Sequence, residues 1–190
     1  MALIASTTII TSVSLFHLTL AFFFLSNPRT INEQALVWVL GNSMGMPNSR
    51  GFESQSHPLG LLSVVLALVG ISDLVSLSMP EEITLIYYWG AQAPIRSFFF
   101  MVVLFYAFLT GPSSPFFASV NPRGRFAHPS AHNPSYTPGT WGGDTLKNRV
   151  AFTFLFLEMI SWFWVWLTLR EERQALVHKL RKRSGEDKDD

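Results

Sequence analysis

The feature that most constrains this chain is an uninterrupted apolar stretch at residues 150–169, VAFTFLFLEMISWFWVWLTL. A helix of about 20 residues rises about 30 Å, which matches the hydrocarbon core of a bilayer. Glu158 lies near the middle of this stretch, and the charged run REER follows it. Because an ionised side chain at that depth costs roughly 2.5–3.5 kcal/mol, Glu158 is expected to face other helices rather than lipid. The sequence therefore predicts a membrane-spanning helix with other helices packed around it.

Three more apolar stretches predict further spans, which together give an all-α, four-helix transmembrane bundle. The four predicted spans are residues 2–25, 59–79, 95–110 and 150–169. The third is short for a span, so that helix either tilts little or begins before Pro94 with a kink. Residues 1–180 are expected to form one integral membrane domain, and residues 181–190 a disordered charged tail.

The composition narrows the classes of protein. Of 190 residues, 48% are hydrophobic and these lie in blocks, as is typical of a membrane protein. A net charge of +1, with basic residues mainly in a short tail among acids, argues against a nucleic-acid partner. No cysteine is present, which excludes disulfides and cysteine metal sites. No cofactor and no metal site are expected, because no second histidine stands one helical turn from His17.

The segments between spans predict short interfacial helices and one long loop. A capping-box pattern, Thr30 to Glu33, predicts the start of a helix over residues 31–40. Another short helix is expected to begin at Pro80. Residues 111–143 are rich in proline, glycine and serine and predict a flexible loop.

The last span has its own start and end signals. Asp144 is a plausible N-cap for the final helix. Beyond Leu169 the helix is expected to continue through Leu180 as a cytosolic extension. Aromatic residues near the predicted span ends are expected to form interfacial belts. They are Trp38, Tyr87, Tyr88, Trp89, Trp164 and Trp166.

Small and polar residues in the first two spans indicate helix–helix contacts. The first half of span one carries many Ser and Thr, whose hydroxyls can bond back to the preceding turn or reach another helix. A buried position in a bundle favours the second alternative. In span two, small and polar side chains fall on one helical face. They are Ser63, Gly70, Asp73 and Ser76.

Depth in the membrane pairs the intramembrane polar residues. Counted along antiparallel spans, His17 and Glu158 lie at similar depth, and Asp73 lies at a level that Arg96 can reach. The pairs His17–Glu158 and Asp73–Arg96 are therefore predicted. Such pairs either fix the register of the helices or form a proton path, an ion path or a polar ligand pocket. The first interpretation is favoured.

Charge in the connecting segments sets the expected orientation. Four spans place both termini on one side, and that side carries a slight excess of Lys and Arg. The positive-inside rule then places both termini in the cytosol and the Pro-rich loop in the lumen.

Three stretches also carry a resemblance to a known family. SLFHLTLAFFFL, SDLVSLSMPEEITLIYYWGAQAPIR and WGGDTLKNRVAFTFLFLEMISWFWVWLTLREER resemble the fungal family named "increased loss of mitochondrial DNA protein 1". The resemblance implies a fungal multi-pass protein of the endoplasmic reticulum membrane. The family name implies an indirect link to mitochondrial DNA maintenance, without a mechanism or catalytic residues.

Three functions remain open at this point. The first is a non-enzymatic structural or accessory subunit, with the lipid bilayer and a membrane protein as its partners. The second is a channel or carrier for an ion, such as potassium or a proton, that uses Glu158, His17 and Asp73. The third is a sterol- or lipid-binding protein whose pocket is lined by Asp73 and Glu158 among aromatic side chains.

Overall fold

The computed structural model of the chain describes residues 4–81, 83–109 and 146–186. Within these ranges the regular secondary structure is helical and no strand is present. In chain order the elements are α1 (Ser6–Ser26), α2 (Pro28–Asn32), α3 (Ala35–Ser43), η1 (Arg50–Phe52), α4 (His57–Ser76), η2 (Ile83–Tyr88), α5 (Trp89–Leu109) and α8 (Arg149–Glu186). Four helical stretches in the described part of the chain are long and apolar enough to cross a membrane, which confirms the predicted fold class.

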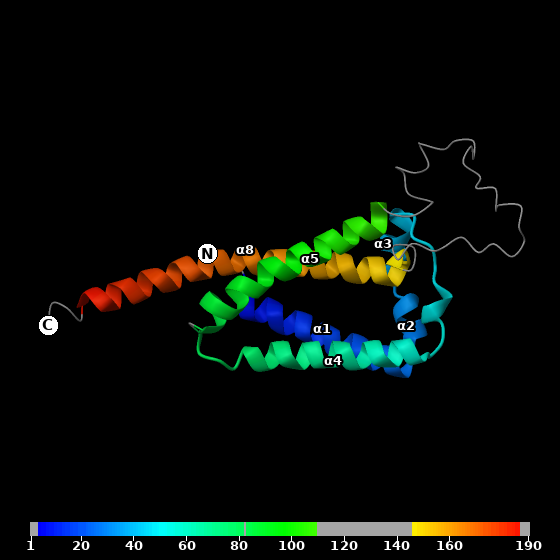
Figure 1. Cartoon of the computed structure of the whole chain (residues 1–190), viewed down its shortest axis with the longest axis horizontal. Coiled ribbons are helices and arrows are strands. Elements are labelled where there is room, and N and C mark those ends of the chain that lie inside the picture. Colours follow the sequence, from blue (N-terminus) through cyan, green and yellow to red (C-terminus); the bar gives the residue numbers. More distant parts are fainter. Residues whose placement is uncertain (1–3, 82, 110–145, 187–190) are drawn as a thin grey trace, which may run out of the picture.

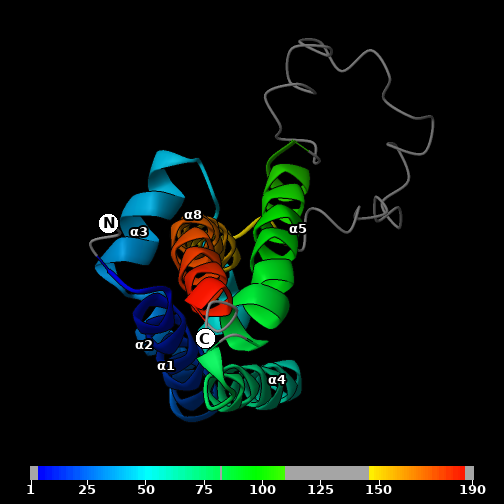
Figure 2. The same ribbon diagram turned by 90° about the vertical axis from the view of Figure 1, so that its left-hand side faces the viewer.

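The four spans form two pairs of neighbouring helices (Figure 1). Helix α1 packs along α4, and α5 packs along α8. Helix α8 also contacts α1 and α3, so it joins the two pairs (Figure 2). The short helices α2 and α3 lie at one end of the bundle, while α8 projects from the other end (Figure 1).

Helix α4 shows why this packing requires a membrane. Its buried face includes the predicted stripe of Ser63, Gly70, Asp73 and Ser76. Its opposite face exposes large apolar side chains, and Leu61, Val64, Leu68, Ile71 and Val75 are each more than half exposed. An apolar face of this extent is rare on a soluble monomer, whereas lipid solvates it, and small inward residues let two backbones approach closely.

Gly70 marks the close approach of α1 and α4. A Cβ added at this position lies 2.9 Å from the carbonyl oxygen of Ser14 and 3.3 Å from Cβ of His17. The contact therefore has no room for a methyl group. Because His17 lies beside it, the same contact fixes the height of that side chain in the bundle.

The hydroxyls of α1 bond mostly within their own helix, which corrects the expectation that they reach across to another helix. The side-chain oxygens of Thr11, Ser12, Ser14 and Thr19 each donate to the carbonyl four residues earlier, at 2.8–2.9 Å. This local partner is always within reach of a helical hydroxyl, whereas a neighbouring helix offers few free acceptors. Ser6 is the exception among the described α1 hydroxyls with a bond to another helix, since it donates to Glu172 of α8.

Two short helices stand where one interfacial helix was predicted. Helix α2 begins at Pro28. Glu33 is the residue after its last one, so it does not form a capping box with Thr30. The prediction was wrong because Glu33 pairs with Arg29 one turn earlier, with 2.6 Å between Nε and Oε1. Helix α3 then begins separately at Ala35.

The third span is longer than predicted and has no separate short helix before it. The helical stretch from Ile83 to Leu109 is continuous, with π-helical geometry in η2 and Pro94 inside α5. Proline lacks the N–H that donates to the carbonyl of Gly90, so the ladder is interrupted there without ending the helix. The alternative in which the helix begins before Pro94 is the one observed.

The ends of α8 also differ from the prediction. Asn148 caps this helix, since its Oδ1 accepts from the N–H of Ala151 at 2.8 Å. The helix continues to Glu186, so residues 181–186 are helical rather than part of a disordered tail. The proposed cap Asp144 and the Pro-rich loop at residues 111–143 lie outside the described residues.

Candidate functional site

The predicted pair of His17 and Glu158 is present at the centre of the bundle. Nε2 of His17, on α1, lies 2.8 Å from Oε1 of Glu158, on α8. The two residues are 3% and 1% exposed, so both are shielded from lipid and from water. Burial of this kind is expected of an intramembrane carboxylate, because a partner within the bundle replaces the missing water.

The second carboxylate oxygen of Glu158 is also occupied. Nε1–H of Trp162, one turn further along α8, donates to Oε2 at 2.8 Å. Trp162 is completely buried. The sequence reasoning assigned the tryptophans of this span to packing and to the interface and missed this donor. The spacing of four residues between Glu158 and Trp162, which places both on one helical face, is the signal that indicates it.

The predicted pair of Asp73 and Arg96 is present as a two-point contact. Nη1 and Nη2 of Arg96, on α5, donate to the two carboxylate oxygens of Asp73, on α4, at 2.6 and 2.9 Å. The Asp73 side chain is 1% exposed and that of Arg96 is 23% exposed. Parallel bonds of this type fix the orientation of the two side chains as well as their distance, and they join α4 to α5 at this level.

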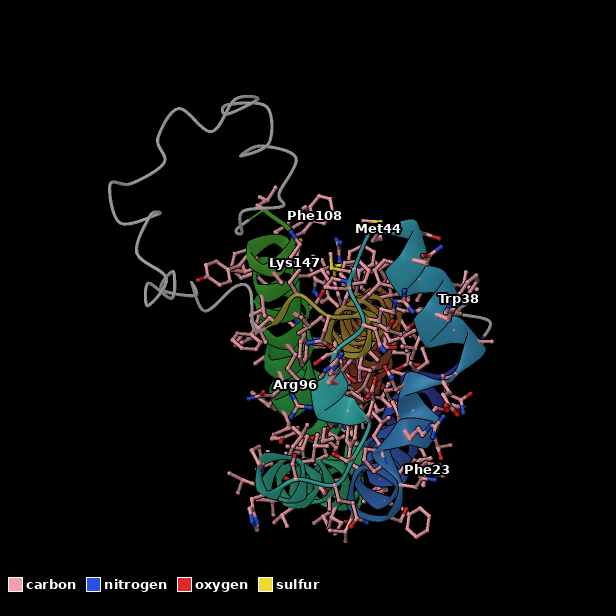
Figure 3. The ribbon with its side chains drawn as sticks, turned by 90° about the vertical axis from the view of Figure 1, so that its right-hand side faces the viewer. Phe23, Trp38, Met44, Arg96, Phe108 and Lys147 are labelled. Carbon is pink, nitrogen blue, oxygen red and sulfur yellow. The ribbon has the colours of Figure 1, made fainter. Side chains whose placement is uncertain are left out.

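Aromatic rings connect the two pairs into one chain of contacts. The guanidinium carbon of Arg96 lies 4.7 Å from the ring centre of Trp162 and 5.2 Å from that of Trp89. A guanidinium at this distance is attracted to the ring electrons. The contacts therefore run from Asp73 through Arg96 and Trp162 to Glu158 and then His17, and they include one or more residues from each of the four spans. Figure 3 labels Arg96 on α5.

Trp89 corrects one of the interfacial assignments. It is 0% exposed and stacks on Trp162, with ring centres 5.2 Å apart and planes at 14°. The prediction was wrong because η2 continues into α5, which carries Trp89 into the bundle instead of leaving it in a connecting segment. Its Nε1 is buried and has no hydrogen-bond partner among the described residues.

The other predicted interfacial aromatics divide into two groups. Trp38, Tyr87 and Trp164 are at least half exposed, which is compatible with a belt at the membrane surface. Tyr88 and Trp166 pack partly against the buried cluster around Trp89 and Trp162. Their depth in a bilayer stays a prediction.

Glu172 makes a partly buried polar contact that the sequence reasoning missed. Its carboxylate accepts from the backbone N–H of Ser6 at 2.9 Å and from the Ser6 hydroxyl. A helix leaves its first N–H groups without internal partners, and a carboxylate at that end satisfies them and the helix dipole. The acidic pair after the last span is the sequence signal, but its partner lies 166 residues away.

An apolar pocket of about 260 Å³ lies among α1, α2, α3 and α8. Its lining includes Phe16 and Phe154, whose rings also flank His17. Neither Asp73 nor Glu158 lines it. This pocket is therefore not the lipid pocket that was predicted around Asp73 and Glu158. The carboxylates of both residues are already hydrogen-bonded to side chains of the bundle.

The chemistry available to the polar chain is limited by these contacts. Both oxygens of each intramembrane carboxylate are hydrogen-bonded to side chains of the protein. Nδ1 of His17 is buried and has no partner in the described part of the chain. No group of three His, Asp or Glu side chains in that part is placed to hold a metal ion. The arrangement can orient four helices, and it leaves Nδ1 of the His17 imidazole without a hydrogen-bond partner among the described residues.

Comparison with known proteins identifies a family for this chain. The sequence model of a family described as "increased loss of mitochondrial DNA protein 1" matches residues 4–179. No curated protein and no solved structure matches this chain significantly.

Proposed function

The chain belongs to the increased loss of mitochondrial DNA protein 1 family, and we propose that it acts as a non-enzymatic, accessory subunit of the endoplasmic reticulum membrane in a fungal cell. The match covers residues 4–179, and four helical stretches that are long and apolar enough to cross a membrane support a membrane location. The link to mitochondrial DNA that the family name carries is then indirect, through a membrane assembly at the reticulum that this subunit supports.

The observation that carries this proposal is the complete pairing of the intramembrane carboxylates. Glu158 is held by His17 and Trp162, and Asp73 by both terminal nitrogens of Arg96. Carboxylates engaged in this way hold helices together, since a substrate or ion must first displace a partner from the protein. The surfaces left for function are the apolar outside and the two ends of the bundle, which suit contacts with another membrane protein.

The orientation proposed for the subunit follows the charge bias. Both termini lie in the cytosol, so the α8 extension is cytosolic and the end formed by α2 and α3 faces the lumen. A cytosolic helix of this length offers a contact surface beyond the membrane.

The accessory role is tested by extracting the tagged chain from its native membrane in a mild detergent and separating the extract on a blue native gel. We expect migration in a species much larger than the free chain, with a partner identified by mass spectrometry. Migration only as a small free species overturns the accessory role. Co-fractionation with markers of an organelle other than the reticulum overturns the location.

A proton or ion carrier is the second candidate, and the unpaired Nδ1 of His17 favours it. The other ring nitrogen, Nε2, lies 2.8 Å from Oε1 of Glu158, so a proton can pass between the ring and the carboxylate within the bundle while Nδ1 is free to bind another. The candidate predicts flux in proteoliposomes that Glu158→Gln abolishes. Absence of flux, or flux unchanged by that substitution, overturns it.

A further inference from the structure

Two recesses lie side by side at the end of the bundle formed by α2 and α3. One is the apolar pocket among α1, α2, α3 and α8. The other, here called the polar recess, has a volume of about 730 Å³. It is lined by Arg29, Asn32, Glu33, Ala35, Trp38, Asn48, Glu53 and Arg149. Adjacent residues join the two: Ile31 lines the apolar pocket and Asn32 the polar recess, and Val150 and Arg149 divide in the same way.

The apolar pocket is built for part of an amphipathic molecule. Its volume of about 260 Å³ is below the roughly 300–1,000 Å³ of pockets that enclose a whole ligand. Its wall is mainly apolar and includes Phe16, Phe23, Phe24, Phe154 and Leu157. A site of this size and lining suits one acyl chain of a lipid whose remainder lies outside the pocket.

One polar atom in that wall has no partner. Thr153 is 3% exposed and lines the pocket, and its Oγ1 has no hydrogen-bond partner among the described residues. A buried hydroxyl without a hydrogen-bond partner costs about 1–3 kcal/mol, so a ligand that accepts a hydrogen bond from this hydroxyl is favoured there. Thr153 lies four residues after Arg149, which is about 6 Å along α8. That depth is where the ester carbonyls of a glycerolipid lie when its headgroup is at the level of Arg149.

The polar recess has the charges of a zwitterionic headgroup. Arg29 and Arg149 supply two cations, and Glu33 and Glu53 supply two anions. The hydrogen bond and charge of Glu33 raise the pKa of Arg29 above its ordinary value, so this cation persists at any physiological pH. Trp38 is 55% exposed and lies on the outer side of α3 (Figure 3), where its ring can receive a substituted ammonium group.

The position of Arg149 is fixed by the fold. A Cβ added at Gly41 of α3 lies 2.4 Å from Cγ of Arg149 and 2.7 Å from its Cβ. Nε of Arg149 donates to the carbonyl of Met46 at 3.2 Å. The stem of this arginine is therefore held against α3 while its guanidinium lines the recess. Asn32 contributes a buried Oδ1 that has no partner in the described part of the chain and can accept from an ammonium N–H.

From these contacts we infer that this end of the bundle binds one zwitterionic glycerophospholipid. The phosphate lies between Arg149 and Arg29, and the ammonium group lies toward Glu33, Glu53 and Trp38. One ester carbonyl accepts from Oγ1 of Thr153, and the attached acyl chain enters the apolar pocket. This inference does not depend on the accessory role, because lipid binding by the purified chain requires no partner protein.

The test uses the full chain, delipidated in detergent and titrated with phosphatidylethanolamine, phosphatidylcholine or phosphatidylglycerol of identical acyl chains. Native mass spectrometry counts retained lipids, and thermal unfolding follows stabilisation. We expect one retained zwitterionic lipid, with phosphatidylglycerol bound at least about tenfold more weakly. Equal retention of all three lipids, or preference for the anionic lipid, overturns the proposal.

Matched variants locate the site. Arg149→Gln and Leu36→Trp, which blocks the wall of the apolar pocket, are each expected to weaken retention about tenfold or more. Arg50→Gln changes an exposed arginine at the same end that does not line the recess, so retention stays at the level of the unmodified chain. If Arg149→Gln fails to fold, Trp38→Ala replaces it, because Trp38 is exposed. Retention unchanged in both Leu36→Trp and Trp38→Ala overturns the site.

Thr153→Val gives a readout that general destabilisation cannot mimic. The substitution removes the unpaired hydroxyl and keeps the shape of the side chain. The delipidated variant is therefore expected to unfold at a higher temperature than the delipidated parent, while its gain on adding phosphatidylethanolamine is smaller. A gain equal to that of the parent contradicts the proposed bond to the lipid ester.

Discussion

His17 and Glu158 lie 141 residues apart in the chain, and their side chains meet at 2.8 Å in the middle of the bundle. The contact joins the first span to the last. Because Trp162 holds the other carboxylate oxygen and also contacts Arg96, this single bond is continuous with the pair that joins α4 to α5. The register of all four spans therefore depends on one connected set of side chains.

Replacing Glu158 separates packing from proton transfer. Glu158→Gln keeps an acceptor for Trp162 and a donor for a neutral His17, so we expect normal expression and nearly unchanged thermal unfolding in detergent. Glu158→Leu leaves both partners buried and unpaired, which is expected to lower the free energy of unfolding by about 1–3 kcal/mol. If the accessory role holds, the Gln variant also complements deletion of the gene. A Gln variant that folds normally but does not complement supports the carrier instead.

The pair of Asp73 and Arg96 is expected to show strong energetic coupling. Removing one charge leaves the other buried without its partner, which costs more than removing both. A cycle of Asp73→Asn, Arg96→Gln and the double variant is expected to give a coupling of about 1–3 kcal/mol in unfolding experiments. Coupling of Arg96→Gln to Glu33→Gln, at the far end of the bundle, is expected within about 0.5 kcal/mol. Equal coupling in the two cycles contradicts a specific ion pair.

The sequence was sufficient to predict the number of spans and the two polar pairs. Apolar length fixes the number of spans, and depth along antiparallel helices fixes which polar groups share a level. For that reason His17 could be matched to Glu158, and Asp73 to Arg96, without any knowledge of side-chain geometry. The stripe of small and polar residues on α4 could be predicted because it interrupts an otherwise apolar sequence pattern.

The remaining details depend on competing local pairs or on contacts that are distant in the chain. Thr30 and Glu33 form a capping pattern, yet Glu33 pairs with Arg29 and α2 ends there. Trp89 has the sequence context of an interfacial residue, but the continuous helix through η2 carries it against Trp162. The bond between Ser6 and Glu172 joins residues 166 positions apart, so no local signal could assign the partner of Glu172.

Gly70→Ala tests the close approach of α1 and α4. The new methyl group meets the backbone oxygen of Ser14 at 2.9 Å, which cannot move without displacing α1. We expect a loss of about 1–3 kcal/mol in the free energy of unfolding. Gly60→Ala on the same helix is the control, since nothing lies within 4 Å of its added Cβ. That variant is expected to be neutral or up to about 1 kcal/mol more stable; equal effects of the two variants contradict the contact.

Glu172→Ala is expected to loosen the start of α1. The backbone N–H and the hydroxyl of Ser6 lose their acceptor, and the loss of a helix cap of this kind costs about 0.5–2 kcal/mol. Hydrogen exchange at the first turn of α1 is the measurement, and faster exchange is expected there than in the unmodified chain. Ser12→Ala is the control, because its hydroxyl is exposed and bonds only to Thr8 of its own helix among the described contacts. Unchanged exchange in Glu172→Ala shows that the cap has no role.

Single cysteines test the span α4 and the orientation together. The chain contains no cysteine, so Ser54→Cys and Ser78→Cys each introduce a single labelling site. The first site precedes α4 and the second follows it. Both serines are exposed, and neither replacement alters a recess or the polar chain. In sealed microsomes a membrane-impermeant maleimide is expected to label position 78 at once and position 54 only after detergent is added. Labelling of both without detergent contradicts α4 as a span. The reverse order keeps the span but places the termini in the lumen, and the end formed by α2 and α3 then faces the cytosol.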